Sequence, residues 1–473
     1  MKKIICLILS ILTVFSLVAC SSAGAGEGAK QEAAGLQAGY GRVSIMPDGE
    51  VHLGGGDASK RISTTIMDNL YITCIALKEN DQTYLIYTID LITADDSVVD
   101  PVKALISGST GVPQENILMN TTHCHSSVSL NTKWDGVDNY RMIFNNAATA
   151  AATTAIADLT PVTVSYGEAA TEGLAFVRHY ELSDGSFAGS NFGNFNNGEI
   201  VGHSTDADNV VQVVQFAREG KKNIVMMNFP AHATMNGKTT DTMISADFPG
   251  TTRMHIENNA DVQVAYFIAA AGDQVPTTKI KGEAVADEYK AYGKALGQYV
   301  LDLLPNLTPA EGTGVKLSTK TYTGNSNREG LDKLPYVDTV IEAGKTYGNT
   351  SAEAVAAARE NGFSSYFEAT AVKSRASLPA TLSMELKAMT VGNIGFVFAP
   401  YEMFGTQAID IRANSPMAST FIITCGEGAQ GYLPSQKGIE IGCYEACVTR
   451  FEYGTAEKLA DEFVNMLSAL KGE

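Results

Sequence analysis

Two histidines separated by one residue, His123 and His125, are the strongest chemical signal in the chain. They follow the short apolar run at residues 117–120, which predicts a β-strand that ends beside them. In extended backbone the side chains at i and i+2 project to one side, so both imidazoles would face the same cavity. Imidazole nitrogen is a preferred zinc ligand, but buried histidines also make purely structural hydrogen bonds. The pair indicates a metal site without establishing one.

Three further side chains of metal-binding type, His232, Glu402 and Tyr432, also follow predicted strands. Zinc takes histidine nitrogen and carboxylate oxygen, and water completes its shell in catalytic sites. Each residue alone is explained as simply by a hydrogen-bonded polar group at a strand end. Their common position at strand ends favours one shared metal site at the rim of a sheet.

The elements that must position these residues are short strands alternating with helices. Paired apolar runs predict hairpins at residues 71–77 with 84–91, 210–216 with 224–229, and 382–390 with 394–398. Helical patterns cover residues 97–107, 138–158, 284–304 and 456–470, and another helix is expected after Glu402. Pro101 would have to lie in the first turn of its helix. Hairpins together with crossover helices predict a mixed α/β fold of layered sheets with flanking helices, in a single large domain at residues 38–473.

Two segments have the composition of loops. Residues 186–202 alternate Gly, Asn and Phe, and residues 321–350 are polar and contain glycine. Each segment is either a tolerated surface insertion or a mobile lid over a cleft. For residues 186–202 we expect ordering over the cleft when an acylated ligand binds, because Phe187, Phe192 and Phe195 would otherwise be exposed.

The first twenty residues indicate the compartment. A short basic start precedes an apolar run at residues 4–18, which is too short to span a membrane comfortably. Leu17-Val18-Ala19-Cys20 resembles a bacterial lipobox, so residues 1–19 are expected to be a signal peptide and Cys20 an acylated anchor. Residues 20–37 would form a flexible tether. This predicts a lipoprotein on an extracytoplasmic membrane face; the alternative is an ordinary secretory signal with a chance cysteine.

The net charge argues against one class of partner, and the cysteine count limits the possible disulfides. The formal net charge is −18 and no basic run occurs, which argues against nucleic acid. No apolar run after the leader approaches the ~20 residues of a membrane span. Of the seven cysteines, Cys6 and Cys20 lie in the leader and anchor, which leaves five. An odd number requires a free or metal-bound thiol, and a bridge between Cys443 and Cys447 stays open.

Several ordered motifs from about residue 39 to the C-terminus resemble the catalytic domain of the neutral/alkaline ceramidase family. The matching segments are His123-Cys124-His125-Ser126, residues 228–234 with Ser245-Ala246-Asp247-Phe248-Pro249-Gly250, Gly272-Asp273-Gln274-Val275-Pro276, Pro400-Tyr401-Glu402, Gly431-Tyr432-Leu433-Pro434 and Tyr444-Glu445. Their common order over some 430 residues is far more specific than any single motif.

The resemblance implies a zinc site and a set of catalytic side chains. The implied zinc ligands are His123, His232, Glu402 and Tyr432. The implied catalytic residues are His125 for proton transfer, Arg178 facing the reacting carbonyl, and Tyr444 near the substrate. This agrees with elementary chemistry: bound zinc lowers the pKa of water toward ~7 and polarises a carbonyl, and a nearby cation stabilises the oxyanion.

The expected function is a zinc-dependent, ceramidase-like hydrolase that cleaves an N-acyl amide, in sphingolipid or other lipid metabolism, with metal-activated water. Three departures alter the walls of the expected site: Ser127-Val128 replaces Gly-Pro, Tyr401 replaces Gly, and Val275 replaces Ser. The C-terminal immunoglobulin-like domain usual in ceramidases is expected to be missing. The alternatives are a zinc hydrolase of another ester or amide, and a lipoprotein that binds a ligand without catalysis.

Overall fold

The computed structural model describes residues 35–55, 61–189, 198–236, 242–280, 283–284 and 287–472. The predicted signal peptide, Cys20 and most of the tether lie outside the described residues, as do residues 190–197 of the predicted lid with Phe192 and Phe195. Of the described residues, Leu36 is already buried in the core and Gln37 pairs with Lys78 of a neighbouring strand, so both belong to the body that was expected from residue 38.

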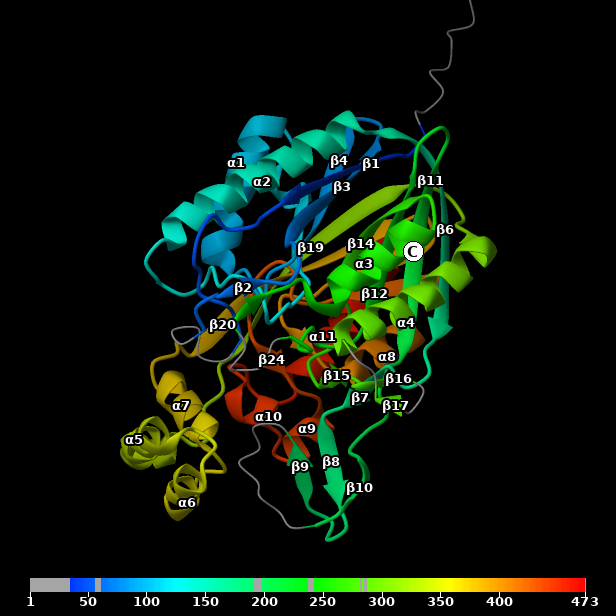
Figure 1. The fold of residues 1–473 in the computed structure, drawn as a ribbon. Coiled ribbons are helices and arrows are strands. Elements are labelled where there is room, and N and C mark those ends of the chain that lie inside the picture. Colours follow the sequence, from blue (N-terminus) through cyan, green and yellow to red (C-terminus); the bar gives the residue numbers. More distant parts are fainter. Residues whose placement is uncertain are drawn as a thin grey trace, which may run out of the picture. The chain divides into compact units, whose positions relative to one another are not determined.

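A large mixed sheet forms the centre of the molecule (Figure 1). Its strands, in spatial order, are β14 (Val262–Ile268), β12 (Asn223–Phe229), β11 (Val210–Arg218), β6 (Thr160–Ala170), β1 (Gln37–Ser44), β3 (Tyr71–Glu79), β4 (Gln82–Ile89) and β5 (Ile117–Thr121), and β18 (Thr308–Pro309) pairs with β6. The predicted hairpins β3–β4 and β11–β12 are confirmed as antiparallel neighbours. The outer pairs β4–β5 and β12–β14 are parallel. The strands that precede His123 and His232 therefore both have a parallel neighbour.

A second, smaller sheet packs against the first. Its order is β19 (Val315–Asn325), β20 (Thr381–Val391), β21 (Ile394–Phe398) and β23 (Ser419–Ile423), and the predicted hairpin β20–β21 is confirmed. Alternate side chains of the large sheet, such as Ile75 and Phe267, meet Phe396 and Phe421 of the small sheet in one apolar cluster. Because side chains alternate between the faces of a strand, the other face of each sheet is free to take helices.

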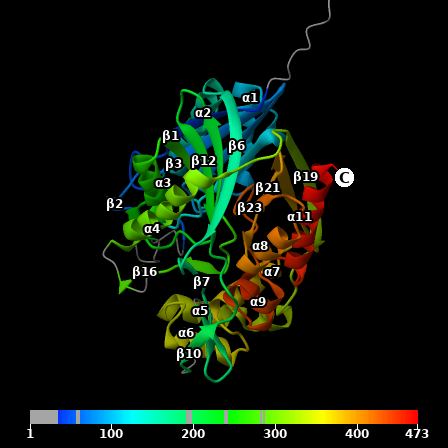
Figure 2. The ribbon, with the colours of Figure 1, turned by 90° about the vertical axis from the view of Figure 1, so that its right-hand side faces the viewer.

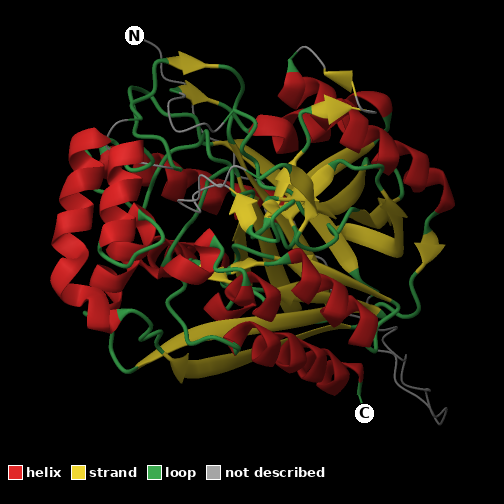
Figure 3. Ribbon diagram, turned by 90° about the horizontal axis from the view of Figure 1, so that it is seen from below, coloured by secondary structure: helices red, strands yellow, loops and turns green. Residues whose placement is uncertain are grey.

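Helices cover both outer faces, so the layers run helices, sheet, sheet, helices. The principal helices are α1 (Asp96–Thr110), α2 (Val137–Ala157), α3 (Asp247–Asn259) and α4 (Glu288–Leu303) on the large sheet, and α8 (Gly405–Asn414) and α11 (Thr455–Lys471) on the small one. Figure 2 shows this order from α3 and α4 to α11, and Figure 3 shows the strands at the centre with helices around them. Gly39 allows α2 to approach closely, since a Cβ there would lie 2.0 Å from the Ala155 carbonyl oxygen.

Three helices and a short 3₁₀ segment are inserted between β19 and β20, at one end of the molecule (Figure 1). They are η3 (Leu331–Tyr336), α5 (Val337–Tyr347), α6 (Ala352–Glu360) and α7 (Tyr366–Arg375), and we call them the helical insertion. The expectation of a loop at residues 321–350 is wrong. Val337, Val340 and Ile341 recur at helical spacing and pack with Val372 in a small core of their own.

The remaining described elements are short. They are β2 (Thr65–Ile66), β7 (Ala175–Val177), β8 (His179–Leu182), β9 (Phe187–Gly189), β10 (Ile200–His203), β13 (Met243–Ile244), β15 (Gln274–Pro276), β16 (Lys279–Ile280), β17 (Glu283–Ala284), β22 (Glu402–Met403), β24 (Tyr432–Leu433), η1 (Gln114–Asn116), η2 (Leu304–Asn306), α9 (Gln436–Glu440) and α10 (Tyr444–Val448).

Two details of the helices differ from expectation. Pro101 lies in the second turn of α1, which starts at Asp96, because Asp95 caps the helix from outside through the Ser97 amide. The helix expected from residue 284 starts at Glu288. Among the described residues, none of the helices has the length and apolar character that crossing a bilayer requires. Within the same residues no cysteine is in a disulfide, Cys443 and Cys447 included.

Candidate metal centre

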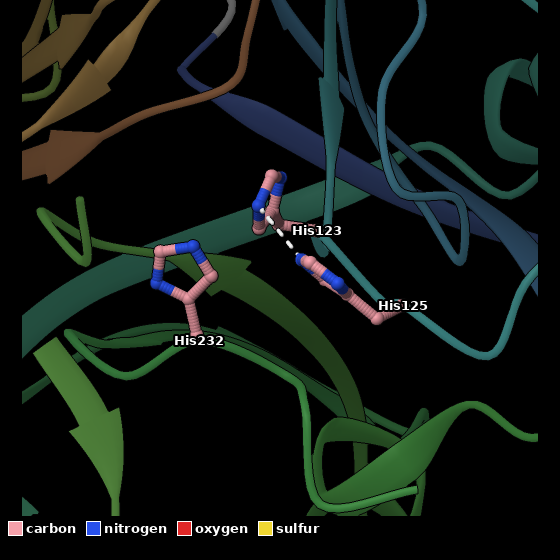
Figure 4. A group of neighbouring side chains, drawn as sticks. All are labelled: His123, His125 and His232. Atoms are coloured by element: carbon pink, nitrogen blue, oxygen red, sulfur yellow. Dashed lines mark hydrogen bonds between the residues drawn. The ribbon is translucent and has the colours of Figure 1, made fainter. Parts of the chain in front are cut away.

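His123 and His125 lie just past the end of β5 (Figure 4). The sequence predicted an extended backbone here, and the structure differs. His123 has a φ of 55°, and a turn follows at Cys124. The two imidazoles nevertheless meet, with 3.2 Å between their Nε2 atoms. A non-glycine residue in the left-handed region costs free energy, so the surrounding structure must hold His123 in place. Hydrogen bonds from Thr122 to Ile89 and from Cys124 to Leu91 do so on either side.

His232 reaches the same point from the end of β12, and its ring centroid lies 4.8 Å from that of His123. Glu402 arrives from β22, with its Oε2 atom 3.2 Å from the Nε2 atoms of both histidines. Tyr432 on β24 is paired in register with Glu402, and its hydroxyl lies 3.5 Å from the His232 Nε2 atom. The structure thus brings the four proposed metal ligands together, with His125 beside them.

The protonation pattern of this cluster suits a cation. The Nδ1 atom of His123 lies 2.9 Å from the Ile92 carbonyl oxygen, and that of His232 lies 3.1 Å from the Gln274 carbonyl oxygen. A carbonyl accepts only, so each Nδ1 carries a proton and each Nε2 atom is the nitrogen that faces Glu402. A metal ion can take the place of a proton at these Nε2 atoms, because imidazole nitrogen and carboxylate oxygen are both metal ligands. Histidines that donate their other ring N–H to a backbone carbonyl are usual around metals.

Burial and charge act together on the ionisation of the cluster. His123 and His232 are almost fully buried. Burial, and then the neighbouring His123, lower the pKa of His125 well below its ordinary value, which keeps its imidazole neutral. Burial also lowers the pKa of His232. Burial would raise the pKa of Glu402, but His123 and His232 outweigh it and hold that pKa well below the usual range. Burial would also lower the pKa of His123, but Cys425 and Glu402 outweigh it and hold that pKa well above its ordinary value. Without a metal ion, the cluster therefore combines a protonated His123 and an ionised Glu402 with two neutral imidazoles.

Arg178 follows β7 and lies at the edge of the metal cluster. Its Nη2 atom is 3.3 Å from the Tyr432 hydroxyl, and its guanidinium carbon lies 5.6 Å from the centre of the Tyr432 ring. Tyr444 is close as well, since its ring centroid is 5.9 Å from that of Tyr432. All seven site residues expected from the sequence therefore lie in one region. Burial raises the pKa of Tyr444 to about 12, so its phenol stays protonated.

The sequence did not reveal four participants in this region. The Ile92 carbonyl and Gly55 touch the histidines, and a Cβ at Gly55 would lie 2.5 Å from the His125 Nδ1 atom. Glu445 binds Arg178, with 2.8 Å from its Oε1 atom to Nε, and His179 donates to its Oε2 atom at 2.9 Å. Neither contact could be read from spacing, because Glu445 is 267 residues from Arg178. The one available signal was the adjacency of Glu445 to Tyr444.

His179, Cys443 and Glu445 also bring potential ligand atoms within 4.8 Å of one another. A second cation there is disfavoured, because the Arg178 guanidinium already contacts the carboxylate. Burial, and then Glu445, raise the pKa of the Cys443 thiol well above its ordinary value, so it is protonated and a poor ligand. This group is better described as a polar support for Arg178.

No protein-family model matches this sequence, and no curated protein matches it either. The fold is similar to solved structures of ceramidases. One is the neutral ceramidase from Pseudomonas aeruginosa, with a TM-score of 0.68 and 16% identity, covering 92% of this chain and 74% of that one. Another is a ceramidase complexed with C2, with a TM-score of 0.68 and 15% identity, covering 92% of this chain and 75% of that one. At such identity the similarity shows a shared fold.

Proposed function

We propose that this chain, which has the fold of the neutral ceramidases, is a zinc-dependent hydrolase that cleaves the amide bond of an N-acyl lipid. The observation that carries the proposal is the convergence of the Nε2 atoms of His123 and His232 on the Glu402 carboxylate. Tyr432 completes the proposed ligand set. Nitrogen and oxygen ligands in this combination suit Zn²⁺.

A zinc ion held by these residues would supply a Lewis acid for the carbonyl and lower the pKa of water at the site. The protein's own groups provide the rest. His125 is kept neutral by burial and is less buried than the other two histidines, so it can accept a proton and pass it to the leaving amine at Nε2. Arg178 presents a guanidinium that stabilises the charge developing on the carbonyl oxygen. Tyr444 lies beside both Tyr432 and Arg178 and would contact the substrate.

The amide substrate is proposed from the fold, since both similar structures are described as ceramidases. The helical insertion contributes an aromatic wall next to the site, because Phe367 lies 5.4 Å from the Tyr444 ring, centroid to centroid. Aromatic surface of this kind suits an acyl chain. A zinc hydrolase of another ester or amide is the second candidate, because Tyr401 and Val275 change the surroundings of the ligands.

The test is metal analysis of the purified full chain together with hydrolysis of a fluorescent N-acyl sphingosine and a panel of N-acyl amides and esters. We expect about one zinc per chain and cleavage of the N-acyl amides. Zinc with cleavage of esters alone would favour the second candidate. A chain without metal and without activity would favour a ligand-binding lipoprotein.

We also propose that the protein is anchored to an extracytoplasmic membrane face by an acylated Cys20. The lipobox-like sequence before Cys20 supports this. In the expressing bacterium, Cys20→Ser should leave the chain unacylated and move it out of the detergent phase, because acyl chains provide the anchoring energy. Unchanged partitioning of this variant would contradict the proposal.

A further inference from the structure

Two nitrogen atoms of the Arg178 guanidinium, Nε and Nη2, are held by protein acceptors. Its Nε atom donates to the Glu445 Oε1 atom at 2.8 Å, and its Nη2 atom contacts the same oxygen. The Nη2 atom also lies 3.1 Å from the Gly272 carbonyl oxygen and 3.3 Å from the Tyr432 hydroxyl. Only 11% of the side chain is exposed. A planar guanidinium fixed through Nε and one Nη group has little freedom to turn.

The carboxylate that fixes Arg178 is itself fixed. Glu445 is completely buried, and its second oxygen accepts a hydrogen bond from the His179 Nε2 atom at 2.9 Å. His179 directly follows Arg178 in the chain, so two adjacent residues grip one carboxylate from the far end of the sequence. The His179 ring packs 5.8 Å from that of Phe404, centroid to centroid. The side chains of Arg178, Glu445 and His179 therefore hold one another, and few other rotamers would keep these hydrogen bonds.

Stability alone gives a weak reason for this arrangement. Burying an ion pair costs desolvation energy that the attraction between the charges barely repays, and apolar replacements are often as stable. The Nη2 atom that Glu445 holds also contacts the Tyr432 hydroxyl, so the fixed guanidinium lies against the metal cluster. A rigid cation beside a reacting carbonyl lowers the barrier more than a mobile one, because no reorganisation is needed in the transition state.

We infer that Glu445 and His179 are positioning residues that orient the Arg178 guanidinium toward the metal cluster. This inference rests on the proposed function, since it assigns how that site holds its oxyanion-stabilising cation. Neither residue touches the substrate; each acts through Arg178. Loss of Glu445 would leave the metal in place and weaken the stabilisation of the transition state.

A double-mutant cycle on the full chain tests this inference. Glu445→Gln keeps the size of the side chain and removes its charge, so we expect kcat to fall ~10- to 100-fold with KM changed less than ~3-fold and zinc retained. Once Arg178→Ala has removed the guanidinium, adding Glu445→Gln should cost less than ~3-fold more. Asp158→Asn is the matched control, because it breaks the Arg218–Asp158 ion pair at a distance from the site and should leave kcat unchanged. Independent, multiplicative effects of Glu445→Gln and Arg178→Ala would overturn the inference.

A second measurement does not depend on activity. Phenylglyoxal reacts with accessible guanidinium groups, and mass spectrometry of the metal-free chain gives the modification rate of Arg178. We expect this rate to rise ~5-fold or more in Glu445→Gln and less in His179→Gln, with Arg141, whose side chain is 38% exposed, as the internal reference. Unchanged rates in both variants would overturn the inference. His179→Gln serves alone if Glu445→Gln does not fold. If the wild-type chain hydrolyses no amide, the proposed function fails while the modification rates still decide the positioning role.

Discussion

Two buried clusters among the described residues each surround one glutamate, Glu427 or Glu402, but the two glutamates have different basic partners. Around Glu427, the Nζ atoms of Lys103 and Lys387 lie 2.6 and 2.7 Å from Oε2, and the Met119 amide donates to Oε1 at 2.5 Å. Every one of these contacts joins a donor to an acceptor. Around Glu402, the basic partners are two imidazole nitrogens, each of which can bind either a proton or a metal ion.

The difference shows which cluster can bind a metal ion, because an ammonium group has no lone pair to give. The lysine–glutamate cluster satisfies its carboxylate with protein atoms and clamps β5 to the segment before Tyr432, since the Glu427 amide also binds the Met119 carbonyl oxygen. The histidine–glutamate cluster has the ligand atoms of a metal site. One cluster therefore holds the backbone that the other needs. Variants of each cluster should have separable effects on metal, catalysis and stability.

The largest expected effect comes from the metal ligands. His123→Ala should lose zinc and activity together, because one of the protein's ligands to the ion is removed. Glu402→Gln should behave in the same way. Zinc per chain by elemental analysis, measured on the same preparation as kcat, checks this. Adding zinc to the metal-free wild-type chain should raise its Tm, and the same addition should leave the Tm of His123→Ala unchanged.

His125→Ala should have the next largest effect and a different signature. We expect zinc near the wild-type level while kcat falls by ~10²–10⁴, because proton transfer is lost and the ligands remain. KM should change little, since the lost interaction is made in the transition state. If His125→Ala loses zinc and His123→Ala keeps it, the roles of the two histidines are reversed.

These roles show how far the sequence alone could lead. Paired apolar runs predicted the hairpins β3–β4, β11–β12 and β20–β21, because strand-forming residue types and the turn residues between them are local properties of the sequence. The histidine and carboxylate positions were likewise visible as polar residues at strand ends. The left-handed backbone of His123 was not, because the residue type does not encode it and hydrogen bonds to distant segments impose it. The grip of Glu445 on Arg178 was invisible for the same reason.

The helical insertion was missed for a different physical reason. The stretch expected to be a loop, residues 321–350, begins and ends with runs of polar residues and glycine, at 323–330 and 344–350, and these masked the helical spacing between them. Only the packing of Val340 and Ile341 against Val372 makes the helical spacing decisive. The order of the strands and the stacking of the two sheets are also set by contacts between distant residues, which one sequence does not display.

Breaking the lysine–glutamate cluster should cost stability rather than chemistry. Glu427→Gln leaves Lys103 and Lys387 buried without their anion, so we expect a loss of about 3 kcal/mol in the free energy of unfolding. The surviving folded protein should keep its zinc. Urea denaturation checks the first expectation, and elemental analysis the second. The exposed pair Lys345–Glu342 is the control, and Glu342→Gln should have no measurable effect on stability. A zinc-free Glu427→Gln would contradict the separation of the two clusters.

Lowering the pH should affect the two clusters one after the other, and this is the smallest of the expected effects. Burial alone would raise the pKa of Glu427, but Lys103 and Lys387 outweigh it and hold that pKa below the ordinary 4.5. Its stabilisation is therefore complete above about pH 4.5 and is lost as the pH falls below it. The stability difference between metal-free wild type and Glu427→Gln should shrink by no more than about 1 kcal/mol between pH 5 and 3.5, since one group contributes at most ~1.4 kcal/mol per pH unit. Zinc should leave earlier, between about pH 6 and 5, because protons compete for the imidazoles. Zinc release that coincides with the stability change would contradict this order.

The helical insertion has a consequence for how the protein could be diversified. Its two ends are register neighbours, since Asn325 at the end of β19 pairs with Thr381 at the start of β20. The whole unit occupies the position of a hairpin turn, so it can be exchanged as a cassette without re-threading either sheet. Its Phe367 backs Tyr444, and its Arg375 binds the Cys447 carbonyl oxygen of α10. Shuffling this cassette among related genes would vary the wall against which a substrate rests while the residues that hold the metal are inherited intact.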